Sequence, residues 1–238
     1  MSERSEYIIN RMKEAGYQLS EDQAAQFLGY YDMMIEKNQV MNLTRITEFK
    51  EAVDKHFVDS LMLSRVLDVS RIHKLIDIGT GGGFPGIPLK IMYPHMSVVM
   101  LDSVGKKIDF VNEVIEKLDL KDVCALHVRA EDMARDRKHR EKYDVCVSRA
   151  VANMTVLTEY CLPFVRVGGF FVAYKGDDRP EELAAAEKAV KVLGGKPMEF
   201  DRFSLFGMGR CLVKIRKDRK TPMQYPRKAG MPAKAPIT

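Results

Sequence analysis

The residues best suited to chemistry in this chain form one glycine-rich stretch, which runs from Leu75 to Gly86 with the sequence LIDIGTGGGFPG. An apolar run that contains one acid, Asp77, gives way to five glycines within eight positions. Glycine lets the backbone approach a ligand closely and adopt positive φ angles. A strand that ends in this way and opens a helix, with Pro85 at the first helical position, aims backbone N–H groups at a ligand. The stretch therefore predicts a nucleotide-like cofactor at the carboxyl end of a strand in an open α/β sheet.

Two classes of cofactor match this stretch. Gly81, Gly83 and Gly86 fit the dinucleotide pattern G-x-G-x-x-G, whereas Asp77-x-Gly79-x-Gly81-x-Gly83 fits the acid-first pattern of enzymes that use S-adenosylmethionine (SAM). In the dinucleotide pattern the first glycine follows the last residue of the strand directly. Here the strand ends one or two residues after Asp77, so Gly81, the first glycine of that pattern, lies too far beyond the strand end. A carboxylate at this place suits the methionine ammonium of SAM and would repel a pyrophosphate. The residues favour SAM and leave a dinucleotide as the alternative.

A second acid lies at the end of the next predicted strand. Residues 97–102 (SVVMLD) read as a strand that ends in Asp102, at about the spacing at which a carboxylate accepts hydrogen bonds from ribose hydroxyls. The alternative is that Asp102 caps the predicted helix from Lys106 to Leu118. With the glycine-rich stretch upstream, the ribose interpretation is favoured, for either class of cofactor.

Three more segments follow predicted strands, where the active sites of such sheets lie. After the third strand, Glu131 is placed to meet the adenine of a cofactor or to cap a helix. After the fourth strand, Arg149 is placed to meet a phosphate, a cofactor carboxylate or a guanine edge. Lys175 follows the fifth strand and is a candidate for a phosphate contact. His56 falls on a predicted helix over residues 48–67, where a lone histidine is more often structural.

Strand and helix alternate from Lys74 onward, which predicts a sheet with helices on both faces. The predicted strands are residues 74–79, 97–102, 123–128, 143–148, 169–175, 198–205 and 210–216. The predicted helices between them are residues 85–93, 105–118, 153–166 and 179–193. Too few residues separate the last two strands for a crossover, so they must form an antiparallel hairpin. A mostly parallel sheet that ends in such a hairpin is typical of class I SAM-dependent methyltransferases, a Rossmann-like α/β fold.

The chain divides into three predicted parts: an N-terminal helical cap over residues 1–70, a SAM-binding domain over residues 71–217 and a C-terminal tail over residues 218–238. In the cap, Ser20 and Gln23 have the spacing of a capping box before an amphipathic helix. The tail contains four prolines and is predicted to be an extended loop.

Composition limits the class of protein. The 238 residues are 46% hydrophobic, which suffices for one α/β domain with an appendage. The four cysteines are widely spaced and form no C-x-x-C pair, so neither a metal site nor a disulfide framework is indicated. A polar N-terminus and the lack of a long apolar run predict a cytoplasmic protein that does not enter a membrane.

Charge is distributed unevenly along the chain. Residues 210–238 carry a net charge of +8, whereas the remaining residues carry −3. A basic tail on a mildly acidic body is expected of a protein that binds a polyanion. A solvated, partly disordered terminus is the alternative interpretation.

Motifs that the chain lacks reduce the number of plausible reactions and methyl acceptors. No Asn/Asp-Pro-Pro-aromatic segment, typical of exocyclic amine methylation, follows the fourth strand, and no Pro-Cys, typical of pyrimidine C5 methylation, occurs. The absence of Tyr-x-x-x-Lys weakens a short-chain dehydrogenase interpretation. An acceptor with its own lone pair, such as guanine N7, needs none of these devices.

Seven motifs together resemble a known family. They are Asn42-Leu43-Thr44, His56-Phe57-x-Asp59-Ser60-Leu61, the stretch from Asp77 to Leu89, Ser103-x-x-Lys106-Lys107, Arg129-Ala130-Glu131, Ser148-Arg149-Ala150 and Tyr225-Pro226-Arg227-Lys228-Ala229-Gly230. The chain is similar in them to the bacterial 16S ribosomal RNA guanine-N7 methyltransferases, the RsmG or GidB family, over residues 40–234. Lys55 stands where that family often has arginine, and Gly82 where it often has alanine or proline.

The resemblance implies a SAM-dependent enzyme that methylates one guanine of 16S rRNA near the decoding site, as naked RNA, as the small subunit or as its assembly intermediate. Such a transfer requires no acid or base residue. The expected cofactor-binding residues, from motif and pattern together, are Asp77, Gly79, Gly81, Gly83, Phe84, Asp102, Ala130, Glu131 and Arg149. The candidates for RNA phosphate contacts are Lys106, Lys175, Arg227 and Lys228.

Three alternatives share parts of this pattern. A SAM-dependent methyltransferase of another RNA or of a protein would have the same cofactor residues. An oxidoreductase would bind NAD in place of SAM. A non-catalytic RNA-binding protein on the same fold would bind RNA without SAM, although the glycine-rich stretch and Asp102 argue against it.

Overall fold

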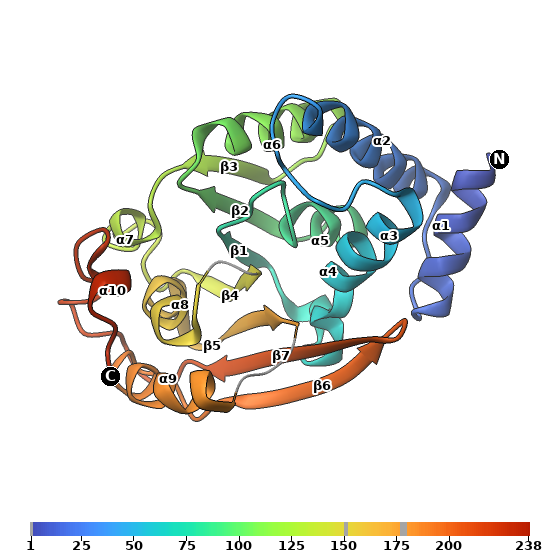
Figure 1. The fold of residues 1–238 in the computed structure, drawn as a ribbon. Coiled ribbons are helices and arrows are strands. Elements are labelled where there is room, and N and C mark those ends of the chain that lie inside the picture. The colour runs from blue at the N-terminus through green and yellow to red at the C-terminus, as the bar shows by residue number, and fades with distance from the viewer. Residues whose placement is uncertain (1, 150–151, 177–179) are drawn as a thin grey trace.

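The strands form one seven-stranded sheet in the order β3-β2-β1-β4-β5-β7-β6 (Figure 1). The computed structural model describes residues 2–149, 152–176 and 180–238. Strands β1 to β5 pair in parallel, and β7 runs antiparallel to both of its neighbours, β5 and β6. The short connection predicts the antiparallel pairing of β6 with β7. The strands are β1 (Lys74–Ile78), β2 (Ser97–Asp102), β3 (Val123–His127), β4 (Tyr143–Arg149), β5 (Val165–Lys175), β6 (Glu199–Leu205) and β7 (Met208–Arg216).

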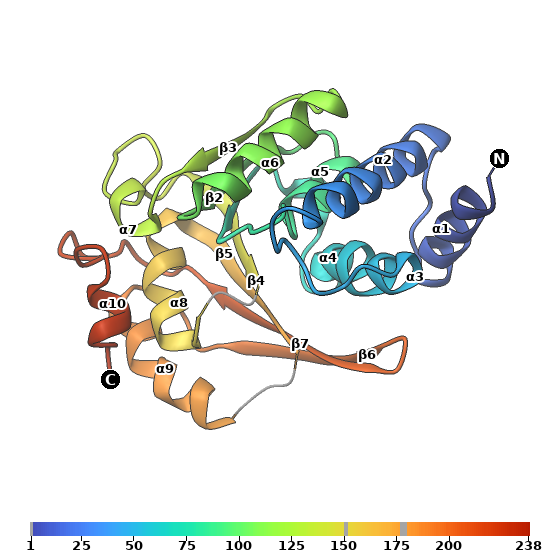
Figure 2. The same cartoon turned by 45° about the horizontal axis from the view of Figure 1, so that its top comes forward.

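Helices cover both faces of this sheet (Figure 2). The α-helices are α1 (Glu3–Glu14), α2 (Glu21–Asn38), α3 (Phe49–Ala52), α4 (Asp59–Leu61), α5 (Gly86–Met92), α6 (Gly105–Lys117), α7 (Ala130–Met133), α8 (Met154–Cys161), α9 (Pro180–Val192) and α10 (Met231–Lys234). Shorter turns are the π-helix Val53–Val58 and the 3-10 helices Met62–Arg65, Val69–Arg71 and Leu162–Phe164. One core lies among the cap helices, α5, α6 and the sheet, and a second lies against α8 and α9.

The apolar core of the N-terminal cap is continuous with the core of the sheet. Phe27 and Tyr30 of α2 are fully buried in the same cluster as Ile87 of α5 and Phe110 of α6. The capping box that the sequence predicts at Ser20 and Gln23 is present. The Gln23 amide also donates to the carbonyl oxygens of Ile91 and Met92, at 2.9 and 3.2 Å. The boundary between cap and sheet domain at residue 70 therefore stays a prediction, because the two parts share one apolar core.

The prediction of one continuous helix over residues 48–67 is wrong. A short α-helix, a π-helical turn over Val53–Val58, another α-helical turn and a 3-10 turn replace it. π-helical turns are rare and are often found at functional sites. This one contains Lys55 and His56, so the irregularity falls on a motif that the resemblance singles out.

Two further boundaries differ from the predicted ones. The helix predicted over residues 153–166 ends at Cys161, because Pro163 has no N–H to continue it, and β5 begins at Val165 instead of residue 169. Pro85 is the residue before α5, whose first residue is Gly86. Residue 179, where the last helix was predicted to begin, lies outside the described residues, as do Ala150 and Val151 of the motif after β4.

The C-terminal tail differs from the extended loop that its prolines predict, because it is docked on the sheet domain and ends in α10. The fully buried ammonium of Lys217 donates to the Leu162 carbonyl at 2.7 Å and also contacts Thr221. Burial lowers the pKa of Lys217 to about 8. The Thr221 hydroxyl in turn donates to the Leu193 carbonyl at 2.8 Å. Polar contacts of buried groups thus fix the start of the tail.

The hydroxyl of Tyr30 ties α2 to the glycine-rich loop by donating to the Gly82 carbonyl at 2.5 Å. Because this bond is buried, Tyr30→Phe leaves an acceptor without its partner, and we expect the free energy of unfolding to fall by about 1–2 kcal/mol. Urea unfolding measures the loss. Tyr31→Phe is the matched control, since the Tyr31 hydroxyl donates to the exposed Thr47 carbonyl at 2.7 Å. An equal loss in both variants would contradict the importance of the buried contact.

Candidate active site

A cavity of about 770 Å³ opens at the carboxyl ends of the parallel strands. The loops after β1, β2 and β3 line one part of it. The ends of β4 and β5, the π-helical turn, the segment before α3 and β7 line much of the rest. Eight of the predicted cofactor-binding and RNA-contacting residues line it together: Gly79, Gly81, Phe84, Asp102, Ala130, Glu131, Arg149 and Lys175. The cavity thus lies at the topological position where open α/β sheets bind ligands.

The loop after β1 presents backbone to the cavity. Gly79, Gly81 and Gly83 have φ angles of +72°, +59° and +106°, a region that favours glycine. A Cβ at Gly81 would meet no atom within 4 Å, whereas a Cβ at Gly83 would approach the Tyr30 hydroxyl to 2.8 Å. The loop is therefore open at Gly81, where a ligand has room, and closely packed at Gly83, which does not line the cavity.

The Asp77 carboxylate braces this loop from behind. Its Oδ2 accepts hydrogen bonds from the Thr80 hydroxyl at 2.6 Å and from the Gly86 amide at 3.0 Å. The side chain is fully buried, and burial raises its pKa to about 7. Its Oδ1 is buried without a hydrogen-bond partner among the described residues. Asp77 does not line the cavity, so the ammonium contact expected from the sequence stays a prediction, and the observed role is to shape the loop.

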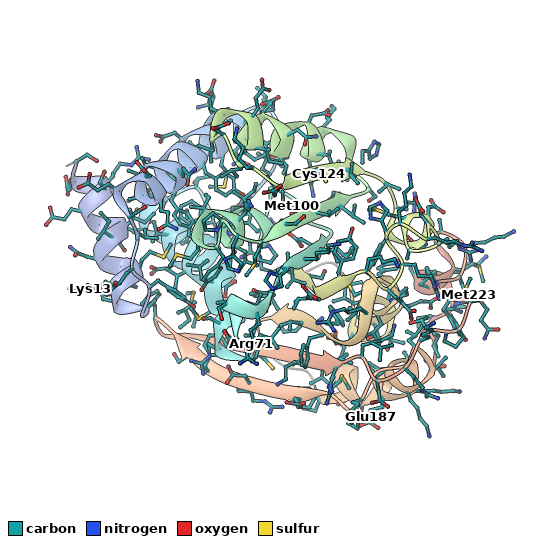
Figure 3. The ribbon with its side chains drawn as sticks, turned by 180° about the vertical axis from the view of Figure 1, so that it is seen from behind. Lys13, Arg71, Met100, Cys124, Glu187 and Met223 are labelled. Atoms are coloured by element: carbon teal, nitrogen blue, oxygen red, sulfur yellow. The ribbon has the colours of Figure 1, made fainter. Side chains whose placement is uncertain are left out.

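Gly86 allows the brace to form. A Cβ at this position would lie 2.6 Å from the Met100 sulfur and 3.0 Å from Asp77 Oδ2. Figure 3 shows Met100 in the interior of the protein, at the sheet beneath α5. The third glycine of the apparent dinucleotide pattern is thus required for packing of α5 against β1 and β2.

Asp102 faces the cavity and also holds the loop. Its Oδ2 accepts a hydrogen bond from the Gly81 amide and its Oδ1 accepts one from the Val104 amide, each at 2.9 Å. Val104 directly precedes α6, whose N-terminus has no side-chain cap, so the alternative interpretation of Asp102 as the helix cap is wrong: its bond to the Val104 amide forms a turn before the helix. The ribose contact stays a prediction. A carboxylate has capacity for further hydrogen bonds besides these two.

Glu131, the first buried residue of α7, lines the cavity with 4% of its surface exposed. Its Oε1 accepts a hydrogen bond from the Gly230 amide at 2.9 Å. The contact joins the cavity to the C-terminal tail, a connection that the sequence did not indicate.

Arg149 is held by residues of the N-terminal cap. It donates to Asp59 Oδ2 at 3.1 Å, to the Lys55 carbonyl at 3.2 Å and to His56 Nδ1 at 3.2 Å. Asp59 is buried and also accepts from Arg210 of β7 at 2.7 Å. Sequence reasoning missed Arg210 and gave no role to Asp59, although Asp59 lies in a motif of the resemblance and its three-residue spacing from His56 on one helical face was available as a signal.

His56 is a neutral imidazole with both nitrogens engaged. Because Arg149 only donates, Nδ1 must accept, so Nε2 carries the proton and donates to the Thr44 hydroxyl at 2.8 Å. The ring stacks on Phe84 with centroids 4.4 Å apart. Burial, and then the charge of Arg149, lower its pKa to about 3. The segment Asn42-Leu43-Thr44 thus reaches the site through Thr44.

The four predicted RNA-contacting cations have different surroundings. Lys175 lines the cavity and pairs with Glu182 at 2.8 Å. Arg227 pairs with Glu159, whose side chain is 1% exposed, at 2.6 Å. Lys106 and Lys228 are exposed. The RNA contacts stay predictions, and the arrangement favours the two exposed lysines over Arg227.

No described helix is long and apolar enough to cross a bilayer. Over residues 2–149, 152–176 and 180–238, histidine, cysteine and carboxylate side chains form no cluster that could hold a metal ion.

Comparison with known proteins identifies relatives over nearly the whole chain. The family model described as rRNA small subunit methyltransferase G (GidB) matches residues 23–205. The ribosomal RNA small subunit methyltransferase G of Desulforamulus reducens is 48% identical over 227 residues, which cover 94% of this chain and 95% of that protein. The protein of the same name from Listeria monocytogenes is 44% identical over 228 residues, 95% of this chain and 96% of that protein.

Solved structures with a similar fold include methyltransferases of low sequence identity. The S-adenosylmethionine-dependent methyltransferase SibL superposes with a TM-score of 0.58 at 11% identity, covering 84% of this chain and 74% of that one. The ribosomal protein L11 methylase of Lactobacillus delbrueckii subsp. bulgaricus superposes with a TM-score of 0.52 at 15% identity, covering 69% and 79%. The class I methyltransferase fold that the sequence predicts is confirmed.

We expect the His56 imidazole to remain neutral from about pH 8 to about pH 5, because burial and Arg149 disfavour its cationic form. NMR of the ring protons, with His56→Gln to assign the signal and an unfolded histidine peptide as reference, measures this. Below about pH 6.5 the unfolded chain takes up a proton at His56 that the folded chain does not, so this residue's contribution to stability is lost as pH falls toward 3. A signal titrating near pH 6.5 would contradict the geometry.

Proposed function

Because the chain belongs to the rRNA small subunit methyltransferase G (GidB) family, we propose that it transfers a methyl group from SAM to N7 of a guanine in 16S rRNA. The observation that supports this most is one cavity lined by the open glycine loop, the Asp102 and Glu131 carboxylates and a set of cations. The proposal covers the cofactor, the RNA substrate and the atom methylated, none of which the family name alone specifies in full.

The residues around the cavity fit SAM. The space at Gly81 accommodates a ligand against the loop backbone, Asp102 offers oxygens to ribose hydroxyls, and Glu131 offers an oxygen to the adenine amino group. Gly79, Phe84 and Ala130 complete the walls on this side. Bound SAM supplies an electrophilic methyl group on a sulfonium.

Guanine N7 suits the side chains that lie beyond the cofactor side of the cavity. N7 has a lone pair and no proton to lose, so the transfer needs no general base. His56 has both nitrogens engaged, and Arg149 has its charge compensated in part by Asp59, which it shares with Arg210. That compensation reduces repulsion between Arg149 and the cationic product base. The chain contributes mainly proximity and orientation, which supply roughly 7–11 kcal/mol in favourable cases.

An RNA substrate fits the charges of the cavity. Its lining combines more cations than anions: the cations are Lys55, Lys107, Arg129, Arg149, Lys175 and Arg210, and the acids are Asp59, Asp102 and Glu131. Such a surface attracts phosphates and steers a polyanion to the site. The exposed Lys106 and Lys228 are the best candidates for further phosphate contacts. Extruding the target base from folded RNA costs a few kcal/mol unless its loop is already open.

Methyl transfer tests the proposal. We expect label from SAM to enter 16S rRNA, or small subunits, prepared from cells that lack this gene, with the label at a guanine N7 mapped by chemical cleavage. The Asp102→Ala variant, which loses the proposed ribose acceptor, should transfer at least about tenfold more slowly at low SAM. Label at another atom or in another RNA would contradict the specificity, and SAM binding without label in any RNA would contradict the substrate.

A further inference from the structure

We infer that residues 225–234, here called the docked segment, form part of the cofactor site by positioning Glu131 for the adenine ring. The inference rests on the proposed SAM function. It assigns the basic motif at the end of the chain to cofactor recognition, in place of the RNA contact that its charge suggests. Figure 1 shows α10 of this segment beside α8, at the end of the molecule where α7 lies.

The contact with Glu131 comes from a backbone group. Gly230 donates its N–H to Glu131 Oε1 at 2.9 Å and has a φ angle of +82°, which favours glycine at this place. Glu131 is 4% exposed and lines the cavity. A hydrogen bond to one oxygen fixes the orientation of the whole carboxyl group. The carboxyl group of this cavity-lining residue is therefore oriented by a residue of the C-terminal tail.

Arg227 anchors the segment. Its backbone N–H and its guanidinium both donate to Glu159, the shortest distance being 2.6 Å, and Nη1 donates to the Ala235 carbonyl at 2.7 Å. Glu159 has a side chain only 1% exposed, and a charge so buried needs a partner. The positive charge of Arg227 is thus paired with a carboxylate of the protein. This ion pair weakens any attraction between Arg227 and an RNA phosphate.

Two arginines of the sheet domain hold the start of the docked segment and Thr221 just before it. Arg135 donates to the Pro226 carbonyl at 2.7 Å, and Arg140 donates to the carbonyls of Tyr225 and Thr221, both at 2.8 Å. Backbone carbonyls are bound here by charged donors, which make the stronger hydrogen bonds. The segment is therefore a fixed support for Glu131 and not a solvated tail.

Adenine recognition should depend on this support. The adenine amino group donates a hydrogen bond, whereas hypoxanthine has an acceptor oxygen at the same place. A carboxylate held in position accepts from the first and repels the second. Loss of the support should leave Glu131 able to turn away, which reduces the preference for adenine.

The test compares binding of S-adenosylhomocysteine and its hypoxanthine counterpart, S-inosylhomocysteine, by calorimetry. We expect the full-length chain to prefer the adenine compound by at least about tenfold. The preference should fall to within about threefold in a chain truncated after Ala229 and in Arg227→Gln, and Arg227→Lys should restore part of it. Lys234→Gln, which removes an exposed cation from the same segment, is the matched control and should keep the full preference.

Kinetic and stability measurements distinguish a loss of Glu131 positioning from a general loss of folding. In the truncated chain and in Arg227→Gln, KM for SAM should rise while kcat at saturating SAM stays within about threefold, and circular dichroism should show both variants folded at the assay temperature. An unchanged preference in the folded variants, or a full-length chain that does not discriminate, overturns the inference. A full-length chain that binds neither compound contradicts the proposed SAM function instead.

Discussion

The hydrogen bonds of the buried Asp77 carboxylate are the interaction on which the site depends. One oxygen spans the loop after β1, from the Thr80 hydroxyl to the Gly86 amide, and so joins the end of the strand to the start of α5. Burial opposes the charge and raises the pKa to about 7, a cost that the two hydrogen bonds partly offset. Because glycine loses more conformational freedom on folding than other residues, a loop with several glycines needs such a brace to hold one shape.

Both ends of the chain complete the cavity that this loop begins. From the N-terminal side, Tyr30 binds the Gly82 carbonyl, and His56 packs on Phe84 while it accepts from Arg149. From the C-terminal side, Gly230 binds Glu131. The sheet alone therefore does not contain the whole site. The part of the cavity at Phe84 and Arg149 is supported by the N-terminal cap, and the part at Glu131 is supported by the C-terminal tail.

The sequence predicts the parts of the structure that depend on local pattern. The mostly parallel sheet, the final hairpin, the capping box and the gathering of Gly79, Asp102 and Glu131 at one edge follow from hydrophobic period, turn length and strand ends. It does not predict that Asp77 lies behind the loop or that Arg227 pairs with Glu159, because burial and long-range partners decide these. The π-helical turn at His56 is not predicted either, because tertiary packing overrides the local helix propensity there.

The affinity for SAM of two Asp77 variants, measured by calorimetry, tests this account most directly. Asp77→Asn keeps an oxygen that can accept from Thr80 and Gly86, whereas Asp77→Ala keeps none. If the carboxylate acts by bracing the loop, Asn binds SAM within about threefold of the parent chain and Ala binds at least about tenfold more weakly. Unchanged affinity in Asp77→Ala would contradict the brace, and an equal loss in both variants would show that the negative charge itself holds the ligand.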